Sequence, residues 1–507
     1  MAASGQVTMR NAEAVRLAAI PHLKLTAFLA AIWEQTRAGQ RLSALFGAPE
    51  ANGQTRLYAV LSDDLRARLS CFSASVADRY PSLTRDCPQA HLFEREIAEQ
   101  WGVIPEGHPW LKPVRFHPSY RPGRDVFAGK SGARPVVGVT DFFRVDGEEI
   151  HEVAVGPVHA GVIEPGHFRF QCHGEQVFHL EISLGYQHRG AERTLIGGPD
   201  KRTIQTMETV AGDTSIGHAT AYCQAVEALA ARQVPIRAEA LRGIALELER
   251  LANHTGDLGA LAGDVGFLPT ASYCGRLRGD FLNLTALLCG SRFGRGMVRP
   301  GGVAFDLDAE RQVPFLERLE AASRDIANAA NLLWNSASVQ ARFEGTGPVT
   351  AETSQALGIV GPAARASGLE RDVRYDFPSG IFRFAQVPVS TWMTGDVFAR
   401  AYVRWLEIQR SLAFIRQQLK AFPDGPLRAE MATLKPEHLV VTLVEGWRGE
   451  ICHVALTDER GCFSCYKIVD PSFHNWTGLA MALRDQQISD FPLCNKSFNL
   501  SYCGHDL

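Results

Sequence analysis

The sequence lacks the short loops by which many enzymes bind nucleotides or activate a nucleophile. It has no G-x-G-x-x-G after a predicted strand and no G-x-x-x-x-G-K-[ST], which excludes dinucleotide or triphosphate binding by those loops. It also has no G-x-S-x-G elbow and no H-E-x-x-H pair, so neither an α/β-hydrolase nor a zinc protease of that type is expected.

Strong charge and long apolar runs are missing as well. With 21% charged residues and a formal net charge of -3, the chain has no basic field, and no nucleic acid partner is expected. No run approaches the roughly 18 apolar residues of a membrane span, and the N-terminal segment does not resemble a secretory signal. The 11 cysteines are single except for Cys462 and Cys465, which favours reduced thiols in a cytoplasmic protein.

One stretch, HPSYRPGRDVFAGKSGARPVVG, is rich in proline, glycine and basic residues. Such composition is typical of a linker between folded segments. We therefore predict an N-terminal domain, a linker and a C-terminal domain, at residues 1–130, 131–150 and 151–507.

Hydrophobic periodicity predicts a different content for each domain. In the first, alternation indicates a strand at 56–63, and three- and four-residue repeats indicate helices at 63–80 and 91–103, so this domain is predicted to be α/β. In the second, β-hairpins are predicted at 166–186 and 450–470, the latter turning at Asp458 to Gly461. Long helices with broad apolar faces follow the pattern of a bundle, at 214–234, 236–261, 313–337 and 396–422. The second domain is therefore predicted to be helix-rich α+β.

Several long strings carry a resemblance to known families. AVGPVHAGVIEPGHFRF, GYQHRGAERTL, SIGHATAYCQAVEAL, ALELERLANHTGDLGAL, RPGGV and VGPAARASGLERDVRYDFP follow one another in the chain. In order and spacing they resemble the large subunit of energy-converting NiFe hydrogenases of the formate hydrogenlyase type, and its homologue, the quinone-site subunit of respiratory complex I. FEREIAEQWGVIPEGHPWLKPVRF resembles the small peripheral-arm subunit of complex I, which is fused ahead of the large subunit in formate hydrogenlyase. The resemblance implies the folds of these two subunits in the same order.

The resemblance also implies a specific loss. In the hydrogenases, C-G-x-C at a helix start and D-P-C-x-x-C near the C-terminus supply four thiolates to nickel, because soft thiolates can bridge nickel and iron. The matching positions here are Ala211, Thr214, Ser501 and Gly504. Cys503 lies between the last two and is expected to face another way. We therefore expect no metal bound by this chain and no hydrogenase catalysis of its own.

The quinone ligands of complex I are missing as well. In that subunit a histidine in a hairpin loop and a tyrosine at a helix start hold the quinone headgroup. The matching positions are Pro165 and Gly212, which cannot make those hydrogen bonds. The match therefore gives no support to quinone reduction, although contact with quinone through other residues stays possible.

A polar cavity is still expected between the first hairpin and the helix start AGDTSIGH. By the resemblance it would collect Glu164, Asp213, His218 and His159, with Ser501 opposite. Such a cluster could relay protons or hold a polar ligand, and the helix start would favour the charged form of Asp213. The alternative is structural: Asp213 or Thr214 caps the helix, and the histidines bond loop backbone.

Three further motifs have two readings each. Cys462 and Cys465, with Cys452 and His453, have zinc-like spacing, but neighbours on a strand point to opposite faces. The motif QHRGAER contains His188, Arg189, Glu192 and Arg193; it is either a structural ion-pair group or a contact with an iron-sulfur subunit. Arg365, Arg371, Asp372 and Arg374 match an arginine-rich segment near the hydrogenase cavity, as a structural or functional network.

These expectations together predict a peripheral-arm core subunit of a membrane-associated complex that couples electron transfer to ion translocation. Iron-sulfur clusters are expected in a partner small subunit, and antiporter-like and anchor subunits in the membrane. The chain would lie in the cytoplasm, against the inner face of the cell membrane. The alternatives are an NADH:quinone-type oxidoreductase subunit with a remodelled quinone cavity, and a non-catalytic scaffold.

Overall fold

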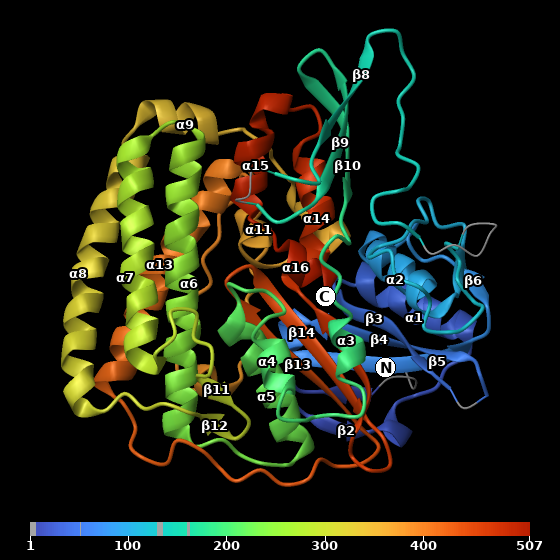
Figure 1. Cartoon of the computed structure of the whole chain (residues 1–507), viewed down its shortest axis with the longest axis horizontal. Helices are drawn as coiled ribbons and strands as arrows, with labels where there is room; N and C mark the ends of the chain where they lie inside the picture. The colour runs from blue at the N-terminus through green and yellow to red at the C-terminus, as the bar shows by residue number, and fades with distance from the viewer. Residues whose placement is uncertain (1–6, 51, 129–134, 160–162) are drawn as a thin grey trace.

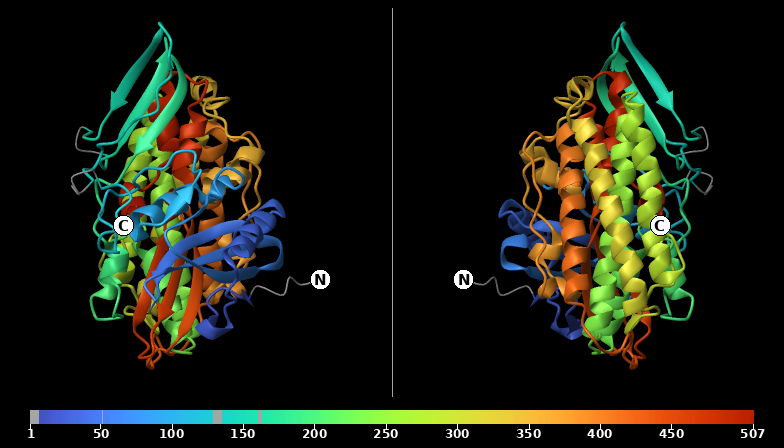
Figure 2. Two further views of the ribbon diagram at one scale, coloured as in Figure 1. Left: turned by 90° about the vertical axis from the view of Figure 1, so that its right-hand side faces the viewer. Right: turned by 90° about the vertical axis from the view of Figure 1, so that its left-hand side faces the viewer.

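The computed structural model describes residues 7–50, 52–128, 135–159 and 163–507. A bundle of long helices forms one side of the molecule, a central β-sheet the middle and the N-terminal α/β region the other side (Figure 1). A three-stranded sheet of β8, β9 and β10 projects from one end, and the side views show the bundle covering one face (Figure 2). Within the described ranges, no helix is long and apolar enough to cross a membrane. The predicted domain boundary near residue 130 falls at 129–134, outside the described residues.

The N-terminal region is built on a four-stranded antiparallel sheet in the order β1-β5-β4-β3. Its strands are β1 (Val7–Met9), β3 (Arg41–Pro49), β4 (Thr55–Asp63) and β5 (Arg68–Val76). Helix α1 (Leu25–Arg37) packs against β3, β4 and β5, and helix α2 (His91–Trp101) contacts β3. The predicted strand at 56–63 and helix at 91–103 are confirmed as β4 and α2.

The helix predicted at 63–80 is wrong, because half of this segment is strand β5 and no α-helix lies in it. Strand β5 lies between β1 and β4, and residues on both of its faces are buried. A strand buried on both faces need not alternate, so the spacing of Leu69, Phe72 and Val76 imitates a helical repeat. Ala67, with a φ of 53°, ends the short 3₁₀ turn before the strand.

A second sheet, in the order β15-β14-β13-β2, joins the two regions. Its strands are β2 (Ala14–Arg16), β13 (His438–Gly446), β14 (Gly449–Thr457) and β15 (Phe463–Val469). Leu439 and Val441 on one face pack into the core of the N-terminal region, whereas Val440 and Val444 on the other face pack into the helical core. Because both of its faces are buried, this sheet contributes to the hydrophobic cores of both regions.

The predicted long helices and the two predicted β-hairpins are confirmed. The bundle contains α6 (Ile236–Asp264), α7 (Leu268–Cys289), α8 (Ala309–Trp334) and α13 (Val397–Lys420), with α5 (Ser215–Leu229) between bundle and sheet. The first predicted hairpin is β9 (His167–His173) with β10 (Gln176–Ser183), joined by β8 (Ile150–Val155) at its edge. The second predicted hairpin is β14 with β15, and its turn has the predicted residues Asp458 to Gly461.

Shorter elements complete the fold. The C-terminal part contains helices α14 (Pro471–Ala482), α15 (Phe491–Phe498) and α16 (Tyr502–Asp506). Other short helices and strands are β6 (Arg79–Pro81), β7 (Ile104–Glu106), α3 (Ala191–Thr194), α4 (Thr203–Met207), β11 (Val298–Arg299), β12 (Gly302–Val303), α9 (Ala337–Phe343), α10 (Ala351–Leu357), α11 (Gly361–Ala366) and α12 (Val373–Asp376). Helix α16 lies beside α14.

Candidate functional site

The four positions that match the hydrogenase cysteines are all buried. Ala211 and Thr214 precede helix α5 and are 0% and 1% exposed, and Ser501, before α16, is 2% exposed. The Ser501 hydroxyl accepts a hydrogen bond from the Gly504 N–H at 2.9 Å, which begins α16. A Cβ atom at Gly504 would lie only 2.7 Å from Cγ and Oδ2 of Asp470. The carboxylate of Asp470 therefore occupies the space that a cysteine side chain at 504 would need.

This set of residues does not fit a nickel–iron centre. A methyl group, two hydroxyl groups and a glycine supply no soft thiolate, and serine and threonine hydroxyls stay protonated at neutral pH. The nearby thiol is that of Cys503, whose Sγ lies 3.4 Å from the Ser501 Oγ, contrary to our expectation that it faces another way. Burial and the neighbouring Glu164 carboxylate raise the pKa of Cys503 to about 11, so this thiol is protonated at neutral pH.

Glu164 and His159 come from the loop before β9. Glu164 is half-buried, and its carboxylate accepts a hydrogen bond from the Tyr502 N–H at 3.2 Å. His159 is separate from this group, because its Nε2 lies 3.0 Å from the carbonyl oxygen of Gly166 in its own loop. The structure thus brings Glu164 to Tyr502 and Cys503. His159 instead bonds loop backbone, as the structural alternative predicts.

Asp213 forms a two-point ion pair with Arg448, which lies in the β13–β14 turn. The Asp213 oxygens are 2.6 and 2.8 Å from the two terminal guanidinium nitrogens of Arg448. Burial acts to raise the pKa of Asp213, but the Arg448 charge outweighs it and holds this pKa below its usual value. The Asp213 carboxylate is thus engaged by Arg448, and the Thr214 side chain accepts no bond from a helix N–H. The simple capping alternative is therefore wrong for these two residues.

His218 lies in a chain of buried polar groups rather than in an open cavity. Its Nε2 is 3.0 Å from Asp470 Oδ2, and its Nδ1 is 3.1 Å from His453 Nε2. His453 Nδ1 in turn lies 3.0 Å from the Tyr466 hydroxyl. Burial, followed by the neighbouring His218, lowers the pKa of His453 well below its usual range, so His453 is neutral. One arrangement of protons satisfies every hydrogen bond in this series. Tyr466 donates to His453, His453 donates to His218, and His218 donates to Asp470.

Glu249 of helix α6 is a member of the site that sequence reasoning missed. Its two oxygens accept hydrogen bonds from the N–H groups of Ile216 and Gly217, at 2.7 and 3.2 Å. These groups begin α5, so a carboxyl from another helix provides the N-terminal cap. Burial raises the pKa of Glu249 to about 8, although the two N–H bonds act in the other direction. Glu249 belongs to the string ALELERLANHTGDLGAL, which the resemblance singled out. Its contact with the start of α5, however, is visible only in the folded structure.

Glu249 makes the stability of the protein depend on pH. Between its ordinary pKa of 4.5 and about 8, the folded state holds a proton that the unfolded state has lost. The free energy of unfolding should therefore fall as pH rises through this window, by at most about 1.4 kcal/mol per unit. Glu249→Gln keeps an acceptor oxygen but cannot titrate, so we expect a flatter dependence in urea unfolding at pH 5.5 and 8.

The matched control for Glu249→Gln is Glu459→Gln, at an exposed position in the β14–β15 turn, which should leave the slope unchanged. Burial also raises the pKa of Glu99 and Asp376 to about 7, so part of the wild-type slope should persist in the Glu249 variant. Identical slopes in the Glu249 variant and the wild type would contradict the prediction.

The two arginine-containing motifs have structural contacts. In QHRGAER, Arg189 donates to the carbonyl oxygens of Thr209, Val210 and Cys503, and Glu192 binds Lys467 at 2.9 Å. In the other motif, Arg365 is fully buried and contacts Glu407 and Glu445 at 2.7 and 2.8 Å. Both motifs hold the elements around the site together.

The zinc-like cysteines are not gathered at one point. Cys452 packs in the N-terminal core, whereas its neighbour His453 faces the His218 side of the sheet. Cys462 lies in the turn and Cys465 on β15. Within the described part of the chain, no three histidine, cysteine or acidic side chains are placed to hold a metal ion.

Comparison with known proteins agrees with this arrangement. Residues 19–131 match the family model of the respiratory-chain NADH dehydrogenase 30 kDa subunit, and residues 264–439 match that of the 49 kDa subunit. The chain thus joins two modules of the kinds found in the respiratory-chain NADH dehydrogenase.

Several proteins are similar in sequence to most of this chain. Formate hydrogenlyase subunit 5 of Escherichia coli is 29% identical over 92% of this chain and 84% of its own length. The carbon monoxide-induced hydrogenase of Rhodospirillum rubrum is 32% identical over 69% of this chain and 97% of its own. NADH-quinone oxidoreductase subunit 4 of Thermus thermophilus is 31% identical over 68% of this chain and 90% of its own. The chain belongs to the family of core subunits shared by complex I and the energy-converting hydrogenases, in its fused 30 kDa and 49 kDa form.

Proposed function

We propose that this chain is a peripheral core subunit of a membrane-associated oxidoreductase complex that couples electron transfer to ion translocation, without a nickel–iron site of its own. For the absence of a nickel–iron site, the observation that carries the proposal is the position of the Asp470 carboxylate, which fills the place of a ligand side chain at residue 504. The buried Asp470–His218–His453–Tyr466 chain supports it, because each of these polar groups is already hydrogen-bonded to another protein group.

The relatives support the proposed partners. Two of the named relatives are subunits of larger enzymes, which supports a place for this chain beside an iron-sulfur small subunit and antiporter-like and anchor membrane subunits. Such a chain would lie on the inner face of the cell membrane. Quinone, if it binds, must use residues other than Pro165 and Gly212, which offer no side-chain donor.

Purification of the tagged full-length chain from gently solubilised membranes tests this proposal. We expect an iron-sulfur subunit and antiporter-like membrane proteins to co-purify, identified by mass spectrometry. A matched preparation carrying an unrelated tagged soluble protein is the control. Recovery of the chain alone, in the soluble fraction and without those partners, would contradict the proposal.

A further inference from the structure

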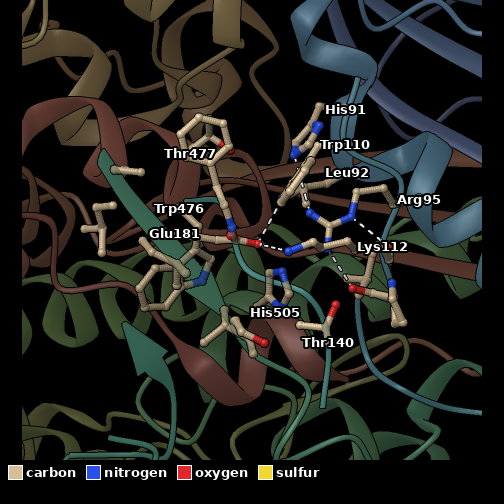
Figure 3. A pocket seen from close by; sticks show the side chains of 18 of the residues that line it. His91, Leu92, Arg95, Trp110, Lys112, Thr140, Glu181, Trp476, Thr477 and His505 are labelled. Atoms are coloured by element: carbon tan, nitrogen blue, oxygen red, sulfur yellow. Dashed lines mark hydrogen bonds and ion pairs between the residues drawn. The ribbon is translucent and has the colours of Figure 1, made fainter. Parts of the chain in front are cut away.

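A cavity of about 350 Å³ lies between the two regions of the chain, and its lining does not include Ala211, Thr214, Ser501 or Gly504. Helix α2 and residues 109–116 form its N-terminal wall, and β10, α14 and α16 form its C-terminal wall (Figure 3). Its volume falls in the range of small-molecule sites. A ligand in this cavity would contact both modules at once.

The carboxylate in the cavity is already neutralised. Glu181 accepts hydrogen bonds from the Trp110 Nε1–H at 2.9 Å and from the Phe143 N–H at 2.8 Å. The Lys112 ammonium also contacts Glu181 as an ion pair, as Figure 3 shows. Glu181 and Lys112 therefore cancel each other's charge, and neither oxygen of Glu181 lacks a donor.

Three donors around the cavity, those of Arg95, Arg484 and Trp476, form no ion pair with a carboxylate of the described residues. Arg95 donates to the carbonyl oxygens of Lys112 and Pro113, and no carboxylate pairs with it among the described residues. Arg484 is exposed at the cavity, and its side chain has no hydrogen bond or ion pair within the same part of the chain. The indole N–H of Trp476, which is 3% exposed, is buried without an acceptor. Among the described residues, the cavity thus has two guanidinium groups outside any ion pair and one buried indole N–H without an acceptor.

Apolar surface makes up much of the rest of the lining. Leu92 and Val114 line the N-terminal wall, and Ile182, Ala480 and Met481 the opposite wall. Apolar walls with a few convergent polar groups are typical of sites for small organic molecules. An inorganic ion would leave these apolar walls in contact with water, whereas the apolar part of an amphipathic anion would cover them.

We propose that this cavity between the modules binds an organic anion, a carboxylate or a phosphate ester attached to an apolar body. Arg95 and Arg484 supply the positive charge for the acidic group, and the apolar part packs on the two walls. His505 of α16 also lines the cavity, so the ligand would stabilise α16, which carries Gly504, relative to the N-terminal region.

Fluorescence titration of the full-length chain with 8-anilinonaphthalene-1-sulfonate tests the site, because this probe is an aromatic anion. We expect saturable binding, displaced by decanoate or phenyl phosphate and not by decylamine, which has the opposite charge. The better competitor assigns the acidic group as carboxylate or phosphate. Displacement by decylamine as strong as by both anions would overturn the proposal.

Reversal of one charge completes the test. Arg484→Glu should weaken probe binding about tenfold or more, because it places a negative charge at the anion site. Arg460→Glu makes the same change at an exposed turn residue and should bind as the wild type does. The Arg484 side chain makes no polar contact within the described residues, so its variant should keep the wild-type unfolding midpoint. Equal affinity for the two variants would overturn the proposal.

Discussion

Replacing Arg365 with methionine is expected to lower the free energy of unfolding by about 3–5 kcal/mol, measured by urea denaturation. The Arg365 side chain is fully buried and contacts the carboxylates of Glu407 and Glu445, at 2.7 and 2.8 Å. These residues lie on α11, α13 and β13, so the guanidinium joins bundle and sheet. Methionine fills similar volume but leaves two buried carboxylates without their cation.

The pKa of Glu407 also indicates that Arg365 stabilises the buried carboxylates. Burial acts to raise the pKa of Glu407, but Arg365 and His254 hold it well below the usual range. Without Arg365, the charged form of Glu407 loses its main support, so the variant should also lose more stability at pH 8 than at pH 5.

Arg276→Met is the matched control for this prediction. Arg276 contacts Asp280 and Asp325 at 2.8 and 2.6 Å, but half of its side chain is exposed. An exposed ion pair contributes about 0–1 kcal/mol, so this variant should unfold close to the wild type. Equal losses in the two variants would contradict the distinction between buried and exposed pairs.

Replacing Gly504 with alanine should lower the free energy of unfolding by about 1–3 kcal/mol, because the new methyl group meets the Asp470 carboxylate. Helix α16 cannot move away freely, since the Ser501 side chain caps it and Asp506 binds the N–H of Gly185 at 2.8 Å. Chemical unfolding of the purified variant measures the loss.

A double-mutant cycle identifies the cause of that loss. Asp470→Ala removes the atoms with which the new methyl group collides, so adding Gly504→Ala to it should cost less than in the wild type, by about 1 kcal/mol or more. Gly212→Ala is the control, because a Cβ there meets nothing within 4 Å. Additive losses for Gly504 and Asp470 would contradict the assignment of this space to the carboxylate.

Much of the fold could be predicted from the sequence because local patterns coincide with it. The alternation around HGEQ predicts β9 and β10, and the apolar repeats of 236–261 and 396–422 predict α6 and α13. Strand β5 was missed because burial on both faces removes alternation. The pairing of β2 with β13 was missed because it joins segments more than 400 residues apart, and no local pattern encodes it.

The candidate site was less predictable than the fold. The resemblance located Ala211, Thr214, Ser501 and Gly504, but not the Asp470 side chain that fills the space beside Gly504. Asp470 reaches Gly504 from the start of α14, and Arg448 reaches Asp213 from a turn between strands. Both contacts join segments distant in sequence, so they depend on tertiary packing that single-sequence patterns do not specify.

The most direct test of the account is the nickel content of the affinity-purified native chain with its co-purified subunits, measured by inductively coupled plasma mass spectrometry. The account predicts nickel far below one atom per chain, with iron present through a partner subunit. A catalytic subunit of a known NiFe hydrogenase, prepared in the same way, is the positive control. One nickel atom per chain, retained through gel filtration, would contradict the account, because Ala211, Thr214, Ser501 and Gly504 cannot hold it.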